Sequence, residues 1–576
     1  MKKQFLLAFG LASMMLAGCS DSDNVADGGN TPDPNAKSYL SLRLNLPTTT
    51  GSGSRADDNF KNDQFDTDRI VSDEYKVNDI TLVCFNASNE IVGKVELTGS
   101  YNWANGTETG ITTQAVLPIQ EVNKDTRKVL VLVNKPASGL TLDNGTTFSA
   151  FNAELSTTVD DLIGTGKDDF FMTNSPLSNR KDGGTSLTTV LVDVKPQNTK
   201  EAAMANQRDI YVERAVGKVS MSVGAGWNAA NWTYSITADE GFKGDQIKIV
   251  AWTIDNYNTK MFPVRKYVDK ASTWEEFTTK PERFVGALKY YGNQYFSIDP
   301  SKRETDGKLE GRTYWCEDPN YDGNTGLHTS TNNLINATDV AAMQKPQYCM
   351  ENTFDVQHMS LKNTTRVIIK ALYTPKDFAE GTWYRLGNSS KPYNLTTLEA
   401  KINAELGLTG TNIVKLKTTG YTYAQGEQEF AAAMFQDATP GTNAAITPAQ
   451  ITKLNNQLGK LIAYIDGYCY YTALVKHFGS EYTPWGEETG APTDGTTTFH
   501  NYVTSHTAND ENYYLGRYGI VRNNWYQLEL GKVSAPGTAK VPKVDTDNTA
   551  DDEQKYYIQA TVKIMDWAVR KQTVDL

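Results

Sequence analysis

Hydrophobic and polar residues alternate near the beginning of the chain. In residues 38–46 leucine takes every second position, and serine, arginine or asparagine stands between the leucines. A period of two is typical of a strand that buries one of its faces. The residues predicted to form the buried face are Leu40, Leu42, Leu44 and Leu46.

A low-complexity stretch follows this predicted strand. The sequence TTTGSGS, which begins after Pro47, contains too few apolar groups to order itself. We therefore expect Arg55, at the end of this stretch, to be exposed to proteases. Cleavage there would make the first strand a removable part of the fold, and its departure would leave an apolar groove for another molecule to fill.

Several other apolar stretches predict a mainly β protein. Residues 80–85 and 91–98 flank the turn-forming sequence NASN, which indicates a hairpin. Residues 128–134, KVLVLVN, form a continuous apolar run of the kind expected at the centre of a sheet. Further strands are predicted in residues 209–223, 246–254, 364–373, 467–478 and 524–530.

One clear helix signal begins at Thr447. Thr447 suits the capping position, Pro448 the first helical position, and Gln450 has the spacing of a capping box. Apolar residues then recur at helical spacing, which predicts a helix packed on a sheet. They are Ile451, Leu454, Leu458, Leu461, Ile462 and Ile465. A shorter helix is expected within residues 148–163.

The C-terminal end changes the phase of its alternation. Apolar residues first occupy even-numbered positions, namely Tyr556, Ile558, Ala560, Val562 and Ile564. They then occupy odd-numbered positions, namely Met565, Trp567 and Val569. A one-residue shift implies a bulge or a second strand segment. Apolar residues continue to Leu576. We expect this apolar edge to pair with another strand; the alternative is an ordinary last strand in its own sheet.

Composition supports a soluble, β-rich protein of more than one domain. The 576 residues include 30 Tyr, 20 Phe and 10 Trp, and 22% of all residues are charged. The net charge of −12 argues against nucleic acid as a partner. Residues 224–230, GAGWNAA, are the best candidate for a domain boundary.

The N-terminus indicates export and lipid anchoring. Lys2 and Lys3 precede an apolar run in residues 5–16 that is too short to span a bilayer. The sequence LAGC that ends at Cys19 looks like a bacterial lipobox, in which the cysteine carries a diacylglycerol thioether. The sequence SDSD in residues 20–23 resembles the surface-export signal of Bacteroidetes lipoproteins. The alternative is an ordinary signal peptide with an incidental cysteine.

The other cysteines show no CxxC spacing and so give little support to a zinc site. Export permits disulfides, and sequence separation favours a Cys316–Cys349 pair. Cys84 alternates with apolar residues and is expected to be a small core residue.

No pattern in the sequence supports catalysis. The five histidines are scattered, and neither HExxH nor GxSxG occurs. One motif has the character of a metal site: Asp318, Asn320, Asp322 and Gly323 match the first half of a calcium loop. Thr329 stands where the loop would need a bidentate glutamate, and the favoured alternative is a turn with Asx hydrogen bonds. No other cofactor is expected.

Taken together, several stretches resemble the Bacteroidales fimbrillins, the FimA- and Mfa-type subunits of type V pili. They are the lipobox at Cys19, the strand ending in a cleavage arginine, VNDITLVCFN (77–86), VLVLVN (129–134), DDFFMTNSPL (168–177), YVERAVGKV (211–219), TYWCEDPNY (313–321), YCMENTF (348–354), DGYCYYTALVKH (466–477), YGIVRNNWYQLEL (518–530) and the final strand. They follow the order of the family along nearly the whole chain.

The resemblance implies two transthyretin-like β-sandwich domains with a few short helices. The expected division is a signal peptide in residues 1–18, a propeptide in 19–55, and sandwiches in 56–225 and 226–576. An arginine-specific protease, gingipain in the best-known relatives, would cut between Arg55 and Ala56 and free the strand. The donor strand that replaces it in a neighbour would lie in residues 555–576. Losing four buried leucines would forfeit on the order of 6 to 12 kcal/mol, comparable with the stability of a whole domain.

The resulting hypothesis is a structural pilin and not an enzyme. The chain would be an outer-membrane lipoprotein precursor that becomes a shaft subunit of a cell-surface fimbrium, polymerises by donor-strand exchange and supports adhesion. Its partners would be other copies of itself, accessory pilus subunits, the processing protease and, through the lipid, the outer membrane. The alternative is a monomeric surface lipoprotein that binds a glycan through exposed aromatic side chains.

Overall fold

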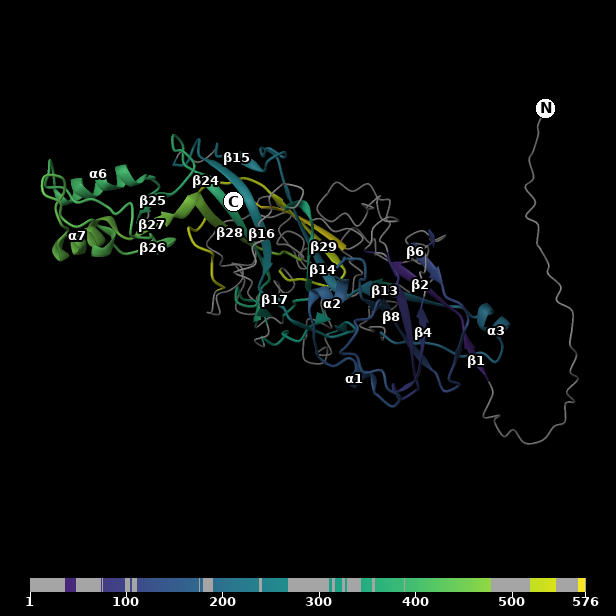
Figure 1. Ribbon diagram of the computed structural model, residues 1–576. Helices are drawn as coiled ribbons and strands as arrows, with labels where there is room; N and C mark the ends of the chain where they lie inside the picture. The colour runs from purple at the N-terminus through teal and green to yellow at the C-terminus, as the bar shows by residue number, and fades with distance from the viewer. Residues whose placement is uncertain are drawn as a thin grey trace, which may run out of the picture.

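A computed structural model gives the fold of this chain. It describes residues 37–47, 74, 76–98, 104–105, 111–175, 177–179, 190–237, 241–267, 310–312, 316–323, 327–328, 343–354, 358–387, 389–477, 518–544 and 568–574. The fold is mainly β with a few short helices, as expected. Figure 1 shows the N-terminal sheet, the C-terminal sheets and a small part that contains the longest helices following one another from right to left.

The N-terminal sheet has nine strands. Their order is β4 (Ile91–Thr98), β3 (Asp79–Phe85), β8 (Lys128–Val133), β10 (Met172–Asn174), β13 (Arg208–Arg214), β2 (Leu42–Pro47), β6 (Ile111–Val116) and β5 (Ala104–Asn105), and β12 (Val192–Asp193) also pairs with β8. β1 (Ser38–Leu40) pairs separately with β7 (Gln120–Val122). The interior position predicted for residues 128–134 is confirmed, because β8 is buried from Val129 to Val133.

The predicted hairpin is also confirmed, since β3 and β4 pair antiparallel. Its turn depends on Asn86, whose Oδ1 accepts hydrogen bonds from the backbone N–H groups of Ser88 and Glu90, each at 2.9 Å. Asn89 takes a φ of 61°, a left-handed conformation that asparagine tolerates well.

Two four-stranded sheets form the C-terminal part. One has the order β23 (Gln347–Met350), β14 (Val216–Val223), β29 (Asn524–Leu530) and β30 (Ala568–Val574), and the other β15 (Thr233–Ser235), β16 (Gln246–Asp255), β24 (Arg366–Thr374) and β28 (Tyr468–Leu474). Both sheets contribute to one hydrophobic core, for example with Leu528 from the first and Ile249 and Val367 from the second. The two sheets therefore pack through their apolar faces.

Residues 209–223 pass from the N-terminal core to the C-terminal core. Residues 209–223 were predicted as one strand, and the structure divides them at Ala215 into β13 and β14. Ala215 and Val216 belong to the N-terminal core, whereas Val219 belongs to the C-terminal core. The change of core thus falls within β14, before residues 224–230.

A third core lies at the end of the molecule farthest from β1 (Figure 1). It is built by the three-stranded sheet β25 (Trp383–Leu386), β27 (Leu461–Tyr464) and β26 (Gly426–Gln428) together with α6 (Leu395–Leu406) and α7 (Pro448–Leu458). The capping box of α7 is confirmed: Gln450 N donates to Thr447 Oγ1, and Thr447 N donates to Gln450 Oε1 at 2.8 Å.

The predicted end of this helix was wrong. Of the six apolar residues placed on one helical face, only Ile451, Leu454 and Leu458 lie in α7. Gly459 takes a φ of 69°, which ends the helix after Leu458. Leu461 and Ile462 lie in β27, and Ile465 begins the short 3₁₀ helix η8 (Ile465–Gly467). Apolar residues after Gly459 keep the helical spacing only by coincidence. The strand β27 that contains two of them has four residues, which is too short for its alternation to be recognised.

The remaining elements are short. They are α1 (Phe148–Phe151), α2 (Val159–Ile163), α3 (Lys200–Ala205), η7 (Ala432–Met434), and the paired strands β9 (Leu155–Ser156) with β18 (Lys260–Met261), β11 (Leu177–Asn179) with β20 (Glu310–Arg312), β17 (Tyr257–Asn258) with β22 (Leu327–His328), and β19 (Lys266–Tyr267) with β21 (Cys316–Glu317). The helix expected within residues 148–163 is two helices, α1 and α2. Over the described ranges, no helix has the length and apolar character needed to cross a membrane.

The expected disulfide between Cys316 and Cys349 is wrong, because neither cysteine is part of a disulfide. Cys316 lies in β21 beside the guanidinium of Arg265, with its Sγ 3.9 Å from Nη1, whereas Cys349 lies in the C-terminal core. Cys84 is a buried residue of the N-terminal core, as predicted. Sequence separation could not show that Cys316 and Cys349 face different surroundings.

Candidate strand-exchange site

The structure divides the predicted first strand at Ser41 into β1, which pairs with β7, and β2. β2 lies inside the N-terminal sheet and not at its edge. β2 runs parallel to β13 on one side and antiparallel to β6 on the other, with Leu44 opposite Ile210 and Ala115. The sequence predicted a strand here but could not name its neighbours. Removing β2 would separate β13 from β6 and leave a gap within the sheet.

Leu40 of β1 and Leu42 and Leu44 of β2 point into the N-terminal core. Leu40 is 4% exposed, and Leu42 and Leu44 are both 0% exposed. The structure describes only the backbone of Leu46, which pairs with Thr113. Burying three leucine side chains contributes on the order of 5 to 9 kcal/mol. This is of the same order as the net stability of a domain, so the N-terminal core depends on this strand or on a replacement for it.

Apart from the backbone hydrogen bonds of the sheet, few polar contacts of residues 37–47 are buried. Tyr39 exchanges two backbone hydrogen bonds with Gln197, at 2.8 and 2.9 Å. Lys37 pairs with Glu121 at 3.0 Å, but both side chains are more than half exposed, so this ion pair adds little. The strand is therefore held mainly by its ladder and its leucines.

The proposed processing residues fall outside the described part of the chain. Cys19, Arg55 and Ala56 all belong to stretches for which the structure makes no statement. The description stops after Pro47 and resumes at Glu74. Lipidation and cleavage therefore stay predictions.

Glu74 is the first described residue on the C-terminal side of the predicted cleavage site, and it is firmly held. Its carboxylate lies 2.8 Å from Lys218 Nζ in β14 and accepts a hydrogen bond from the hydroxyl of Tyr348 in β23. Its backbone oxygen accepts from Arg214 Nε at 3.1 Å. Burial alone would raise the pKa of Glu74, but attraction by Lys218 and Arg214 outweighs it and lowers the pKa. The chain after the cleavage site is thus tied to the region where the two cores meet.

Buried ion pairs connect the N-terminal sheet to the segments that lead into the C-terminal sheets. Arg265 forms two 2.7 Å hydrogen bonds with Glu213 of β13, and both side chains are 1% exposed. Arg522, just before β29, pairs with Glu351 at 3.0 Å. Arg265 also donates to the backbone oxygen of Arg522 at 3.0 Å.

The sequence reading missed these pairs, although a signal was present. Glu213 stands within the apolar stretch YVERAVGKV, and Arg522 within YGIVRNNWY. A charge inside an apolar strand needs a buried partner of opposite charge. The identity of the partner could not be read, because 52 residues separate Glu213 from Arg265 and 171 separate Glu351 from Arg522.

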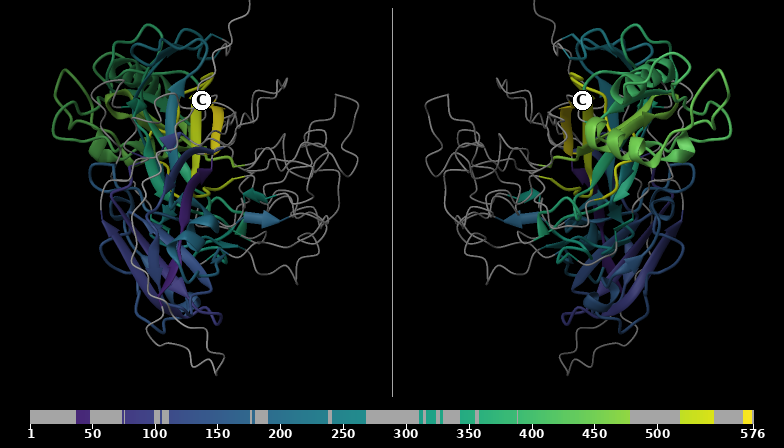
Figure 2. Two further views of the ribbon diagram at one scale, coloured as in Figure 1. Left: turned by 90° about the vertical axis from the view of Figure 1, so that its right-hand side faces the viewer. Right: turned by 90° about the vertical axis from the view of Figure 1, so that its left-hand side faces the viewer.

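The C-terminal strand occupies the edge of its own sheet. β30 runs parallel to β29, with Ala568 opposite Asn524 and Val574 opposite Leu530. Figure 2 shows these two strands, in yellow, side by side. Of the predicted donor residues, Val569 lies in β30 opposite Trp525. The others lie outside the described residues: Tyr556, Ile558, Ala560, Val562, Ile564 and Trp567.

The calcium-like motif forms a polar turn. Asp318 Oδ1 accepts from the backbone N–H of Asn320 at 2.6 Å, which is an Asx hydrogen bond. Asp318 Oδ2 accepts from the backbone N–H and the hydroxyl of Thr353. Burial raises the pKa of Asp318 to about 7. Asn320 is buried and donates to Asn258, whereas Asp322 is exposed. Over the described ranges, no group of three or more His, Cys, Asp or Glu side chains is arranged to hold a metal ion.

Two family models match the chain. The model of the major fimbrial subunit protein FimA matches residues 38–214, which run from the first residue of β1 to the last residue of β13. The C-terminal model of the major fimbrial subunit protein type IV, fimbrillin, matches residues 493–573 and so reaches into β30. Both ends of the chain match fimbrillins. The resemblance drawn from the sequence is therefore confirmed.

Several solved structures are similar to this chain. A candidate cell adhesion protein from Parabacteroides distasonis is 13% identical, with a TM-score of 0.28, and the match covers 60% of this chain and 77% of that one. A fimbrial assembly protein from the same organism is 10% identical, with a TM-score of 0.25 and coverage of 61% and 90%. The tip fimbrial protein Mfa3 from Porphyromonas gingivalis is 10% identical, with a TM-score of 0.25 and coverage of 60% and 83%. No match was found among curated proteins.

Proposed function

We propose that this fimbrillin is a shaft subunit that polymerises by donor-strand exchange. The family matches support a fimbrial, adhesion-related role at the cell surface. The observation that carries the finer proposal is the position of β2 between β13 and β6, with Leu42 and Leu44 fully buried. A strand inside a sheet can be replaced only by another strand that supplies both ladder hydrogen bonds and apolar side chains.

The proposed replacement is the C-terminal stretch of a second copy. Residues 556–564 carry an apolar side chain at every second position, which is the pattern of the leucines they would replace. In the single chain, β30 pairs in parallel with β29 alone among the described strands. Parallel pairing at an edge is weaker than pairing on both sides within a sheet, so transfer into a neighbour's groove would be favourable.

The proposed maturation has three steps. The precursor is anchored through Cys19, cut between Arg55 and Ala56 by an arginine-specific protease, and loses its first strand. The ion pair of Glu74 with Lys218 and its backbone hydrogen bond with Arg214 would keep the new N-terminal segment attached to the rest of the fold while the first strand leaves.

Limited trypsin digestion of a soluble precursor that lacks the signal peptide and Cys19 tests this proposal. The expected result is cleavage after Arg55, followed by SDS-resistant ladders on gels. Arg55→Gln should prevent both events. Deletion of residues 556–576 should abolish the ladders and leave cleavage intact.

A nicked chain that stays monomeric would contradict polymerisation and favour the monomeric glycan-binding alternative. That alternative relied on exposed aromatic side chains. Among the side chains whose burial the structure gives, the exposed large hydrophobic one is Met204, and the aromatic ones are buried or half-buried.

A further inference from the structure

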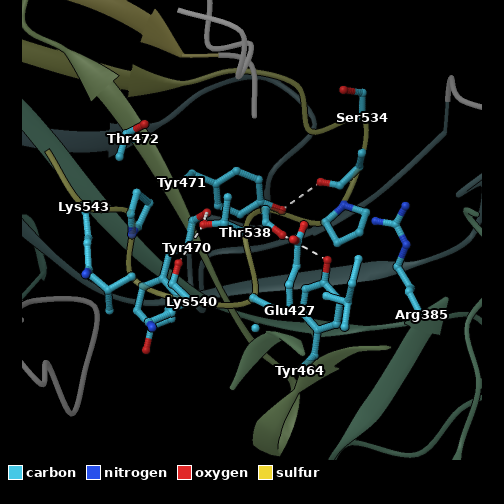
Figure 3. Close-up of a pocket in the computed structure, with 18 of the residues that line it drawn as sticks. Arg385, Glu427, Tyr464, Tyr470, Tyr471, Thr472, Ser534, Thr538, Lys540 and Lys543 are labelled. Atoms are coloured by element: carbon cyan, nitrogen blue, oxygen red, sulfur yellow. Dashed lines mark hydrogen bonds between the residues drawn. The ribbon is translucent and has the colours of Figure 1, made fainter. Parts of the chain in front are cut away.

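A pocket of about 660 Å³ lies where the third core meets the C-terminal sheets. One side is formed by β26 and β27, with Glu427 and Tyr464, and another by Tyr470 and Tyr471 of β28. Residues 534–543, here called the strap, complete the wall. Figure 3 shows Arg385 and Lys543 on opposite sides of the pocket, with the tyrosines between them. Its volume is in the range of small-molecule sites, which often form between packed units.

The strap is fixed in place, so the pocket is already formed. Thr538 and Tyr470 exchange backbone hydrogen bonds of 2.8 and 2.9 Å. The hydroxyls of Tyr471 and Tyr464 donate to the strap carbonyls of Ala535 and Gly537 at 2.9 and 3.2 Å (Figure 3). A Cβ atom at Gly537 would collide with the carbonyl of Tyr470, so glycine is needed for this close approach.

The charge of the pocket is opposite to that of the chain. Arg385, Lys540 and Lys543 line it, with Glu427 as the one carboxylate among its lining residues, in a protein of net charge −12. Glu427 Oε2 also lies 3.5 Å from Lys460 Nζ at the surface. Arg385 is positioned by a 2.7 Å hydrogen bond from its Nε to the backbone oxygen of Ser389. This local excess of positive charge favours an anionic ligand.

Polar groups are distributed around the wall and not gathered at one end. The hydroxyl-bearing residues Ser534, Thr472 and Thr538 line the pocket together with the apolar residues Ile462 and Pro536. A pocket for a fatty acid would be a continuous apolar tube with polar groups at one end only, which is a different arrangement from this one. A sugar presents hydroxyls and C–H faces in alternation along its length, and this wall can match both.

We propose that this pocket binds an acidic oligosaccharide in which uronic acid units carry the negative charge. Arg385 at one side and the strap lysines at the other would contact carboxylates of different sugar units, and the hydroxyls between them would contact the sugar hydroxyls. This assignment goes beyond polymerisation and does not depend on it.

Isothermal titration of the full soluble precursor with hyaluronan tetrasaccharide tests the assignment. The expected result is saturable binding that is lost when the carboxylates of the tetrasaccharide are reduced to alcohols. Lys540→Gln combined with Lys543→Gln should weaken binding at least about tenfold, because it removes two of the three cationic side chains that line the pocket. Ser534→Trp, which places a bulky side chain at an exposed position of the lining, should also abolish binding.

The matched control is Lys124→Gln combined with Lys195→Gln, which removes the same charge from exposed positions outside the pocket lining. An equal loss of affinity in this control would show non-specific attraction and overturn the proposal. No binding at millimolar tetrasaccharide, or equal binding of hexanoate or sulfate at the pocket, would also overturn it. The ladder assay on the same variants separates this result from polymerisation, which the pocket variants should leave unchanged.

Discussion

Glu74 and Lys218 form an ion pair of 2.8 Å in which both side chains are largely buried, 12% and 6% exposed. Glu74 belongs to the segment that follows the predicted cleavage site, and Lys218 lies in the strand that passes from the N-terminal to the C-terminal core. The Nζ atom of Lys218 also lies over the ring of Trp525, 4.1 Å from its centroid. The pair therefore joins the segment that follows the predicted cleavage site to the strand that passes between the two cores.

Replacing Glu74 with glutamine should destabilise the precursor. The change leaves Lys218 buried without its anionic partner, and loss of one partner of a buried pair typically costs about 3 to 5 kcal/mol. Urea unfolding followed by circular dichroism would measure the loss as a lower midpoint. Glu121→Gln, in the exposed pair with Lys37, is the matched control and should leave the midpoint unchanged. Equal midpoints for Glu74→Gln and the unaltered chain would contradict the role of the pair.

The contribution of Glu74 should depend on pH in a defined direction. Burial opposes ionisation, but Lys218 and Arg214 hold the pKa of Glu74 below its usual value. The folded state then binds the proton less tightly than the unfolded chain does. Stabilisation by the ionised carboxylate is complete above the unfolded pKa of about 4.3 and is lost as the pH falls through the lower folded pKa. The stability difference between the unaltered chain and Glu74→Gln should therefore shrink under acid conditions; a constant difference would contradict this assignment.

Leu44→Ala should weaken the precursor but not the assembled fibre. Leu44 is fully buried, and truncating a buried leucine to alanine costs about 2 to 5 kcal/mol. If β2 is removed on maturation, the same substitution cannot affect the polymer made from the cleaved chain. Thermal unfolding before and after trypsin treatment would show this difference. Leu132→Ala, in the interior strand β8, should destabilise both forms, and a polymer weakened by Leu44→Ala would contradict removal of the strand.

Glu213→Gln should be among the most destabilising single changes near the centre of the molecule. Glu213 accepts two hydrogen bonds from Arg265 and one of 3.2 Å from Ser175, and its loss leaves a buried guanidinium without an anion. The expected cost is about 3 to 5 kcal/mol in urea unfolding. The double variant Glu213→Leu with Arg265→Met should recover much of it, because no unpaired charge remains. A double variant as unstable as Glu213→Gln would show that the pair has a role that apolar packing cannot replace.

The four cysteines after Cys19 should all react as thiols only when the chain unfolds. All four are buried, and burial raises the pKa of Cys84 to about 11 and of Cys349 and Cys469 to about 12. Little thiolate exists at neutral pH, so a thiol reagent should label none of them in the native soluble precursor. In concentrated guanidinium, without a reductant, four thiols should react. Two reacting thiols would instead indicate a disulfide.

Local pattern was enough to predict the described strands of seven residues or more and the start of α7, but not α6 or most of the short strands. The hairpin around Asn86 follows from apolar runs on either side of turn residues, and the cap at Thr447 follows from its spacing to Gln450. Both depend on residues within a few positions of one another. The end of that helix was misread, because periodicity alone does not distinguish a last helical turn from the strand that follows Gly459.

Sequence by itself determined that residues 38–46 are extended with leucine at every second position, although the structure divides them into β1 and β2, and it indicated the fimbrillin resemblance that the family models confirm. Only the tertiary structure decided where β2 lies, because a period of two defines a face but not the neighbours, which here are residues 208–211 and 111–116. It alone also decided the partners of the buried charges. Glu74 meets Lys218 across 144 positions and Tyr348 across 274, and no local pattern encodes contacts over such distances along the chain.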